Sequence, residues 1–303
     1  IKSNRPIFKK IKSFVGSNHQ DLDEQDIGFS IGPRINAVGR LDHADKIVKA
    51  FVDDDDQLLI KYMDVCNEKR KQIQQQIFEE AVDQAYKYAD DPILFLGGEW
   101  HQGVVGIAAS KVAEKFWKPT WLFQEKAELC KGSARSIPHF NVTETMSEAR
   151  ELFTKFGGHS AAAGFSFATM NKDLIRQKLC EFSLQVRDES PSLWESSISY
   201  DFEIDCSLLN LILADKIAEL RPFGHCFEQP IFMVKVLLSK IEYYNDKTTG
   251  VKKHTVLWVR DHYSRKYKVI FFNWVIEDPK QDQFLSLLLK VSKNYWNNSY
   301  RLN

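Results

Sequence analysis

The spacing of hydrophobic positions predicts one long helix early in the chain. Between Gln57 and Tyr88 the sequence has no glycine or proline, and apolar residues recur at helical spacing. The middle of this segment, Asn67–Gln76, is strongly polar. We interpret residues 56–90 as a connector helix between two bodies, and a polar surface helix is the alternative.

After this helix the pattern changes to short apolar runs that alternate with amphipathic segments. The runs predicted as strands are Ile93–Leu96, Thr120–Phe123, Gly132–Ile137 and Ala161–Phe167, and the predicted helices are Val104–Phe116, Val142–Phe153 and Leu174–Val186. Strands that alternate with helices predict an α/β domain with a largely enclosed sheet over residues 91–188.

Beyond Asp188–Pro191, which we interpret as a linker, the chain becomes rich in strand patterns. The predicted strands are Ile198–Asp205, Ile231–Glu242, His254–Asp261 and Lys266–Trp274, with one predicted helix at Leu208–Leu220. Several short strands favour a small β-barrel, and the five-stranded oligonucleotide-binding type is the natural candidate.

Composition narrows the class of protein. The chain has 303 residues, with 41 basic and 41 acidic side chains, which is ordinary for a globular protein of about two domains. No apolar stretch approaches the roughly 20 residues of a membrane helix. The five cysteines are far apart and never form a C-x-x-C pair, so we expect a cytoplasmic protein without a disulfide scaffold or zinc ribbon. Because the first residue is Ile1 rather than Met, we expect a fragment.

Basic and acidic residues are unevenly distributed along the chain, although the net charge is zero. The stretch Lys240–Lys268 holds eight basic and three acidic residues, with aromatic residues interleaved. Single-stranded nucleic acid needs cations for its phosphates and flat faces for its bases, and this stretch offers both. A solvated sheet face over core aromatics is the simpler interpretation of composition alone.

Two glycine-containing clusters precede or open predicted elements. In GPRINAVGRL, Arg34 and Arg40 lie six residues apart and are suited to clamping a phosphate, or they are surface charges beside a tight turn. His101 and Gly103 stand where a helix begins, and glycine there lets an anion approach free backbone N–H groups. A hydrogen-bonded structural histidine is the alternative, and the Walker spacing is absent.

Two further clusters combine cations with small residues. Lys131, Ser133 and Arg135 alternate along a predicted strand, so they share one face and make a phosphate cradle, although a polar edge strand would look the same. Gly157 and Gly158 predict a bend that carries a histidine and is followed by small residues. That histidine could bind phosphate or a metal, or be incidental to a glycine turn.

The motifs GPRINAVGRL, HQGVVGIAASK, KGSARS and KFGGHSAAAG, in that order, resemble those of the RecJ family, the single-strand-specific 5′-to-3′ DNA exonucleases of bacteria. Asn67–Arg70 and Leu220–Gly224 fit as well, although His225–Phe227 departs from the family's usual continuation. Members have a DHH catalytic domain, a long helix, a DHH-associated domain and an oligonucleotide-binding barrel.

The resemblance therefore implies a fold for each part of the chain. Residues 1–55 would be the tail of the DHH catalytic domain and residues 56–90 the connector helix. Residues 91–188 would form the DHH-associated α/β domain, and residues 194–303 an oligonucleotide-binding β-barrel cut near its last strands.

The reaction implied by the resemblance is phosphodiester hydrolysis with two manganese or magnesium ions. The family builds its metal site from Asp-rich motifs and an Asp-His-His that precede the GPR segment, and this chain has no Asp-His-His. We therefore expect no catalytic residue, no metal ligand and no bound metal in this chain alone, and little or no nuclease activity.

The resemblance instead implies that this chain grips the strand. Ser133 and Arg135 match the segment that binds the 5′-terminal phosphate in the family. His159, with Gly157 and Gly158, would face the scissile region across the cleft.

Arg34, Asn36 and Arg40 would support the domain junction or contact phosphate. We expect a monomer that binds single-stranded DNA in DNA repair and recombination, with a separate catalytic DHH domain as a candidate partner and no membrane association. Two alternatives stay open: a DNA- or partner-binding remnant without catalysis, and a DHH-family phosphodiesterase of short oligonucleotides. The barrel segment argues against the second.

Overall fold

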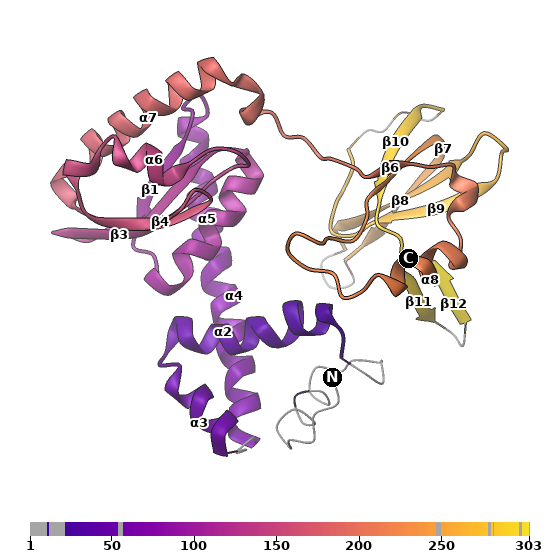
Figure 1. The fold of residues 1–303 in the computed structure, drawn as a ribbon, viewed down its shortest axis with the longest axis horizontal. Helices are drawn as coiled ribbons and strands as arrows, with labels where there is room; N and C mark the ends of the chain where they lie inside the picture. The colour runs from indigo at the N-terminus through magenta and orange to yellow at the C-terminus, as the bar shows by residue number, and fades with distance from the viewer. Residues whose placement is uncertain are drawn as a thin grey trace. The chain divides into compact units, whose positions relative to one another are not determined.

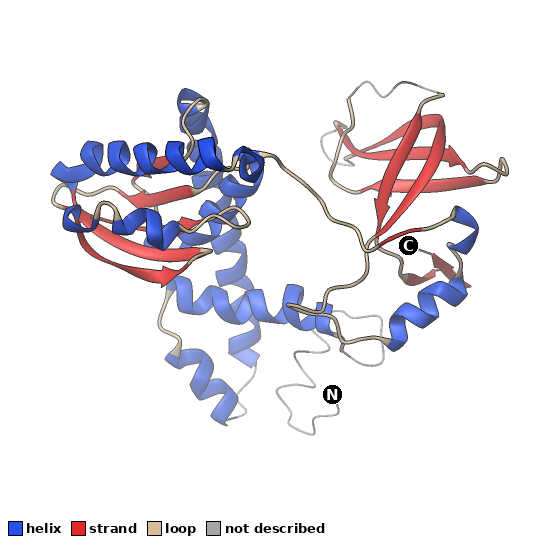
Figure 2. Ribbon diagram, turned by 45° about the horizontal axis from the view of Figure 1, so that its top comes forward, coloured by secondary structure: helices blue, strands red, loops and turns tan. Residues whose placement is uncertain are grey.

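The computed structural model describes residues 11, 22–53, 57–246, 250–277, 280, 282–296 and 299–302. The chain forms two compact units, Ile1–Ser197 and Ile198–Asn303. The first unit combines helices with one sheet, and the second consists mainly of strands (Figure 2). Of the residues expected to be the tail of a catalytic domain, 1–10, 12–21 and 54–55 lie outside the described residues.

The predicted long helix is confirmed as α4 (Gln57–Ala85), which a 3₁₀ turn at Tyr86–Tyr88 continues. Met63, in its first half, belongs to a core shared with the N-terminal helices. Ile77, in its second half, packs into the core beneath the sheet. The helix therefore joins two cores of the first unit, which explains why its middle is polar.

The segment that contains the GPRINAVGRL motif is helical. A π-helical turn (η1, Asp26–Ile31) leads into α2 (Gly32–Leu41), and α3 (Asp45–Asp53) follows. The tight turn considered for this motif is wrong, because a proline in the first turn suits a helix and Ala37 is buried against α4.

The sheet of the first unit has five strands in the order β1-β2-β3-β5-β4. The strands are β1 (Leu94–Gly98), β2 (Thr120–Gln124), β3 (Leu129–Arg135), β4 (Phe153–His159) and β5 (Ala162–Ala168). The helices between and after them are α5 (Gln102–Phe116), α6 (Val142–Ser147) and α7 (Lys172–Glu189). Only β1 and β2 run parallel, and the other pairs are antiparallel.

Helices cover the sheet from both sides, as Figure 1 shows. Phe95 and its neighbours pack against α6 and α7 on one face, while Leu94 and Leu96 pack against α4 and α5 on the other. Burial on both faces explains why β1 is a continuous apolar run. The predicted α/β domain is confirmed.

Two local predictions in this domain are wrong. The helix expected over Val142–Phe153 ends at Ser147, and Phe153 begins a strand instead. The bend expected at Gly157-Gly158 lies inside β4, so the chain turns only after His159. A register shift between Phe153 and Lys155 breaks the period-two pattern, which hid this strand from sequence analysis.

The second unit is built around the sheet β10-β7-β8-β9, with β6 paired to β7 and a separate β11-β12 hairpin. Its elements are β6 (Phe202–Glu203), α8 (Leu211–Glu219), β7 (Phe232–Asn245), β8 (Lys252–Arg260), β9 (Lys266–Phe271), β10 (Phe284–Leu289), β11 (Lys293–Trp296) and β12 (Ser299–Leu302). The predicted strand Ile198–Asp205 shrinks to β6 because Ile198 and Tyr200 are exposed and form no sheet pairing. The last three strands were not predicted. The core lies between β7, β8 and β10.

Candidate nucleic-acid interface

The register of β3, β5 and β4 places nine residues in three rows on one face of the sheet. The rows are Lys131-Ser166-Lys155, Ser133-Gly164-Gly157 and Arg135-Ala162-His159. Their neighbours along the strands point to the opposite face and enter the core. The shared face expected for the three β3 residues is therefore present, and tertiary pairing extends it to two further strands.

Over β5 and β4 this face is open. A Cβ atom built on Gly157 or Gly164 would meet no described atom within 4 Å. Both glycines are exposed and pair with each other, and Ala162 in the next row is small. We call Gly157, Ala162 and Gly164 the shelf. Exposed Lys131 and Lys155 flank the shelf at one end, and His159 flanks it at the other. A polyanion can therefore lie close to the backbone of the shelf.

Gly158 has a different role from its neighbour. Its φ is +155°, and a Cβ atom there would lie 2.3 Å from the carbonyl oxygen of Ala162. Glycine is therefore required by the close pairing of β4 with β5. The structure gives Gly158 a packing function in this hairpin.

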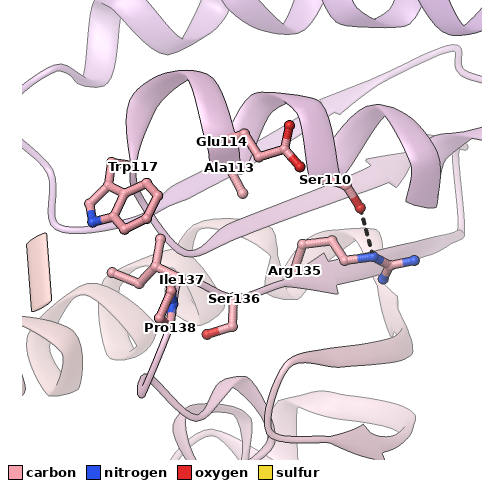
Figure 3. A pocket seen from close by; sticks show the side chains of 8 residues that line it. All are labelled: Ser110, Ala113, Glu114, Trp117, Arg135, Ser136, Ile137 and Pro138. Atoms are coloured by element: carbon pink, nitrogen blue, oxygen red, sulfur yellow. Dashed lines mark hydrogen bonds between the residues drawn. The ribbon is translucent and has the colours of Figure 1, made fainter. Parts of the chain in front are cut away.

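Arg135, at the end of β3, has only neutral partners. Its Nε donates to Ser110 Oγ at 3.1 Å, as Figure 3 shows, and its Nη1 donates to the Ala134 carbonyl oxygen at 2.7 Å and to Ser133 Oγ. A Cβ atom on Gly106 of α5 would lie 2.9 Å from Arg135 Nη2. Burial lowers the pKa of the Arg135 guanidinium, and the charge of Arg40 lowers it further.

Arg40 reaches the same region from the end of α2. Its Nη1 donates to the carbonyl oxygen of Gly103 at 3.1 Å, and a Cβ on Gly103 would lie 2.1 Å from the Arg40 carbonyl oxygen. Glycine thus allows α2 to touch the start of α5. His101 is the N-cap of α5, because its Nδ1 accepts from the Gly103 N–H at 3.1 Å. This geometry assigns His101 a structural hydrogen bond.

Arg70 is a residue of this region that sequence analysis did not select. It donates to Asn67 Oδ1 at 2.6 Å and to Gln74 Oε1 at 2.7 Å, and both amide side chains are buried. Burial lowers the pKa of Arg70, the charge of Arg40 lowers it further, and the Glu68 carboxylate offsets part of this shift. The family resemblance pointed to the stretch Asn67–Arg70. Only the fold shows that Arg70 lies near Arg40.

Arg40, Arg70 and Arg135 together form what we call the arginine cluster. Arg40 is close enough to each of the other two to shift its pKa. Among the ion pairs between described residues, none involves a member of the cluster. Arg40 is exposed, whereas Arg70 and Arg135 are partly buried. Guanidinium groups that form no ion pair are suited to binding an anion.

The other candidates in α2 lie elsewhere. Arg34 Nε is 3.1 Å from Asp64 Oδ1, and its Nη1 donates to the Ser30 carbonyl oxygen at 2.9 Å. Asn36 is exposed on α2. The structure therefore engages Arg34 in an ion pair with α4, whereas Arg40 joins the arginine cluster.

In the second unit, the outer face of β7, β8 and β9 carries cations beside aromatic rings. Lys240 and Lys268 lie opposite Trp258 in the register. Lys268 Nζ donates to Tyr244 Oη at 2.8 Å and lies 5.7 Å from the Trp258 ring centre. Glu242 neutralises Lys240 at 2.6 Å. We call Lys240, Tyr244, Trp258 and Lys268 the basic-aromatic surface.

A divalent metal does not fit the residues that the structure describes. Among them, no group of three or more His, Cys, Asp or Glu side chains is arranged to hold a metal ion. In the described ranges, none of the helices combines the length and apolar character needed to cross a bilayer.

Comparison with known proteins identifies both units. The DHHA1 domain family matches residues 56–183, and the RecJ OB domain family matches residues 200–303. The single-stranded-DNA-specific exonuclease RecJ of Bacillus subtilis is 28% identical over 98% of this chain and 38% of the relative. RecJ of Escherichia coli is 31% identical over 75% of this chain and 42% of the relative.

The chain belongs to the RecJ family. The crystal structure of RecJ in complex with Mg²⁺ from Thermus thermophilus covers 99% of this chain, with a TM-score of 0.79 and 21% identity, and 45% of that structure is matched. A RecJ structure bound to manganese covers 60% of this chain and 46% of its own, with a TM-score of 0.54 and 26% identity. The RecJ resemblance and the predicted fold class are confirmed. The chain spans about two fifths of these curated RecJ relatives.

Proposed function

We propose that this chain binds single-stranded DNA and holds its phosphorylated 5′ end, as the strand-gripping part of a RecJ-type exonuclease in DNA repair and recombination. The observation that carries the proposal is the arginine cluster, because Arg135 bonds Ser133 and no member of the cluster forms an ion pair with a described carboxylate. The names of the curated relatives, single-stranded-DNA-specific exonucleases, support the choice of ligand.

A terminal phosphate suits this cluster better than an internal one. It carries about one further negative charge at neutral pH and three exposed oxygens, and several guanidinium groups can share them. Ser133 Oγ and the Arg135 guanidinium lie together at the β3 ends of the two rows that contain the shelf. A strand held at its 5′ end can then cross the shelf.

The shelf and its lysines suit the next part of the strand. Lys131 and Lys155 are exposed and lie in one row across β3, β5 and β4, so they can neutralise phosphates that pass over the glycines. Such contacts are made to the DNA backbone and carry no base sequence information.

The basic-aromatic surface of the second unit suits a further stretch of single strand. Trp258 and Tyr244 offer flat faces for bases, and Lys268 between them offers a cation. Stacking of bases on aromatic rings beside cations is how oligonucleotide-binding folds hold single strands without sequence preference.

We assign strand binding, rather than bond cleavage, to this chain. Structures of related RecJ proteins are named as complexes with Mg²⁺ or Mn²⁺, and the residues described here do not fit such a site. We propose that metal-dependent hydrolysis belongs to a DHH catalytic domain as its partner, with residues 1–55 as the tail of that domain and residues 56–90 as the connector. We propose a monomeric cytoplasmic protein.

The test compares two 12-nucleotide single strands that differ only in a 5′-phosphate or a 5′-hydroxyl. Fluorescence anisotropy in EDTA should show roughly ten- to hundredfold tighter binding of the phosphorylated strand, as one charge-assisted contact of about 1.5–3 kcal/mol predicts. Equal affinities would refute the 5′-phosphate grip. A parallel digestion with Mn²⁺ should leave both strands intact, and cleavage that persists after removal of contaminating nuclease would refute the assignment to binding alone.

A further inference from the structure

The residues on one face of α5 approach the arginine cluster near the start of the helix and line a pocket near its end. Gly103, Gly106, Ser110, Ala113 and Trp117 are three or four residues apart, so they lie on one side of the helix. The two glycines face Arg40 and Arg135, as described above. The second half of the stripe instead lines a pocket.

The pocket has a volume of about 280 Å³ and lies between α5 and the segment that follows β3 (Figure 3). The side chains that matter here are Ala113, Glu114, Trp117, Arg135, Ile137 and Pro138. The volume is below the range of about 300–1,000 Å³ that is common for drug-sized ligands, so the pocket suits one ring system rather than a whole nucleotide.

The walls of the pocket are mainly apolar, although Ser110 and Ser136 also line it, and Trp117 is held in place. Trp117 ends α5 in a left-handed conformation with φ of 50°, and its Nε1 donates to the Leu193 carbonyl oxygen at 3.1 Å. Ile137 is buried and Pro138 is exposed at the rim. A tryptophan fixed at both backbone and ring gives a flat ligand a preformed surface.

The charges around the pocket disfavour a phosphate inside it. The guanidinium of Arg135 extends away from Trp117 and Ile137 and bonds Ser110, so the aliphatic part of Arg135 is the part nearer to these two side chains (Figure 3). Glu114 lines the rim, and no hydrogen bond or ion pair joins its carboxylate to another described residue. A neutral, flat group with N–H donors matches apolar walls and a free carboxylate, as a nucleobase does.

We propose that this pocket receives the base of the 5′-terminal nucleotide, whose phosphate is held by Ser133 and Arg135. The inference rests on the proposed function. Arg135 is the shared wall: its guanidinium faces the phosphate site and its aliphatic chain faces the base. Guanine is the favoured base, because its adjacent N1–H and N2–H donors suit the Glu114 carboxylate.

The test uses 5′-phosphorylated single strands that carry either guanine or an abasic residue at the first position. Fluorescence anisotropy of the full chain in EDTA should show about five- to tenfold weaker binding of the abasic strand, as loss of one stacked base predicts. Glu114→Phe places a ring in the pocket from an exposed helix position. It should weaken binding of the guanine strand to the abasic level and leave the abasic strand unchanged.

Glu128→Phe is the matched control, because Glu128 is also exposed and precedes β3 at the end opposite Arg135. This variant should bind both strands as the original chain does. Equal binding of guanine and abasic strands by the original chain would overturn the base pocket and leave the 5′-phosphate grip standing. Failure to distinguish 5′-phosphate from 5′-hydroxyl would overturn the proposed function and the base pocket together.

Discussion

Replacing Arg135 with methionine tests the arginine cluster most directly. Methionine keeps an unbranched side chain beside α5 but removes the charge and every donor. Arg135 is the member that bonds Ser133, the other residue expected at the 5′-phosphate. The variant therefore separates phosphate recognition from packing.

The contacts of Arg135 determine how much binding affinity and how much folding stability the variant should lose. A hydrogen bond to a charged group contributes about 1.5–3 kcal/mol, so Arg135→Met should weaken binding of a 5′-phosphorylated strand by roughly ten- to hundredfold. The variant also loses neutral bonds to Ser110 and to the Ala134 carbonyl oxygen. It removes a partly buried cation beside Arg40, which offsets part of that loss. We expect the free energy of unfolding to fall by no more than about 1–2 kcal/mol.

The assay is a two-by-two comparison of protein and ligand. Anisotropy titrations in EDTA would measure the original chain and Arg135→Met with 5′-phosphorylated and 5′-hydroxyl strands, and urea unfolding would measure stability. The variant should lose most of the preference for the 5′-phosphate and keep its affinity for the 5′-hydroxyl strand. A preference that survives the substitution, or an equal loss for both strands, would refute the assignment of Arg135 to the terminal phosphate.

Three further outcomes follow from other parts of the structure. Gly158→Ala should destabilise the first unit by about 1–3 kcal/mol in urea unfolding because its Cβ collides with β5, whereas Gly157→Ala should be tolerated; equal effects would contradict this packing. Burial beside Asp91 raises the pKa of Cys180 to about 11, so at pH 8 a thiol reagent should modify exposed Cys226 first, and faster labelling of Cys180 would contradict its burial. Lys268→Gln should lower the affinity for 5′-phosphorylated and 5′-hydroxyl strands equally. It should also reduce the slope of log affinity against log salt concentration by about 0.7, and an unchanged slope would remove this lysine from the interface.

Local periodicity was enough to predict the elements that bury one clear face. The α4 segment shows its apolar residues at helical spacing, and β3 alternates Lys131, Ser133 and Arg135 with core residues. It was insufficient where geometry is irregular. The register shift after Phe153 hid β4, and glycines at both ends of GPRINAVGRL suggested a turn where buried Ala37 makes α2 a helix.

The candidate site divides in the same way. The sequence by itself determined the family motifs and the residue types of a phosphate cradle, because both are local properties of the chain. Only the tertiary structure decided that Arg40 stands near both Arg70 and Arg135 while Arg34 pairs with Asp64. Strand order likewise built the shelf, since β5 lies between β3 and β4. Periodicity reports which face of an element is buried, whereas partners depend on long-range register and on how helices meet, which no local pattern encodes.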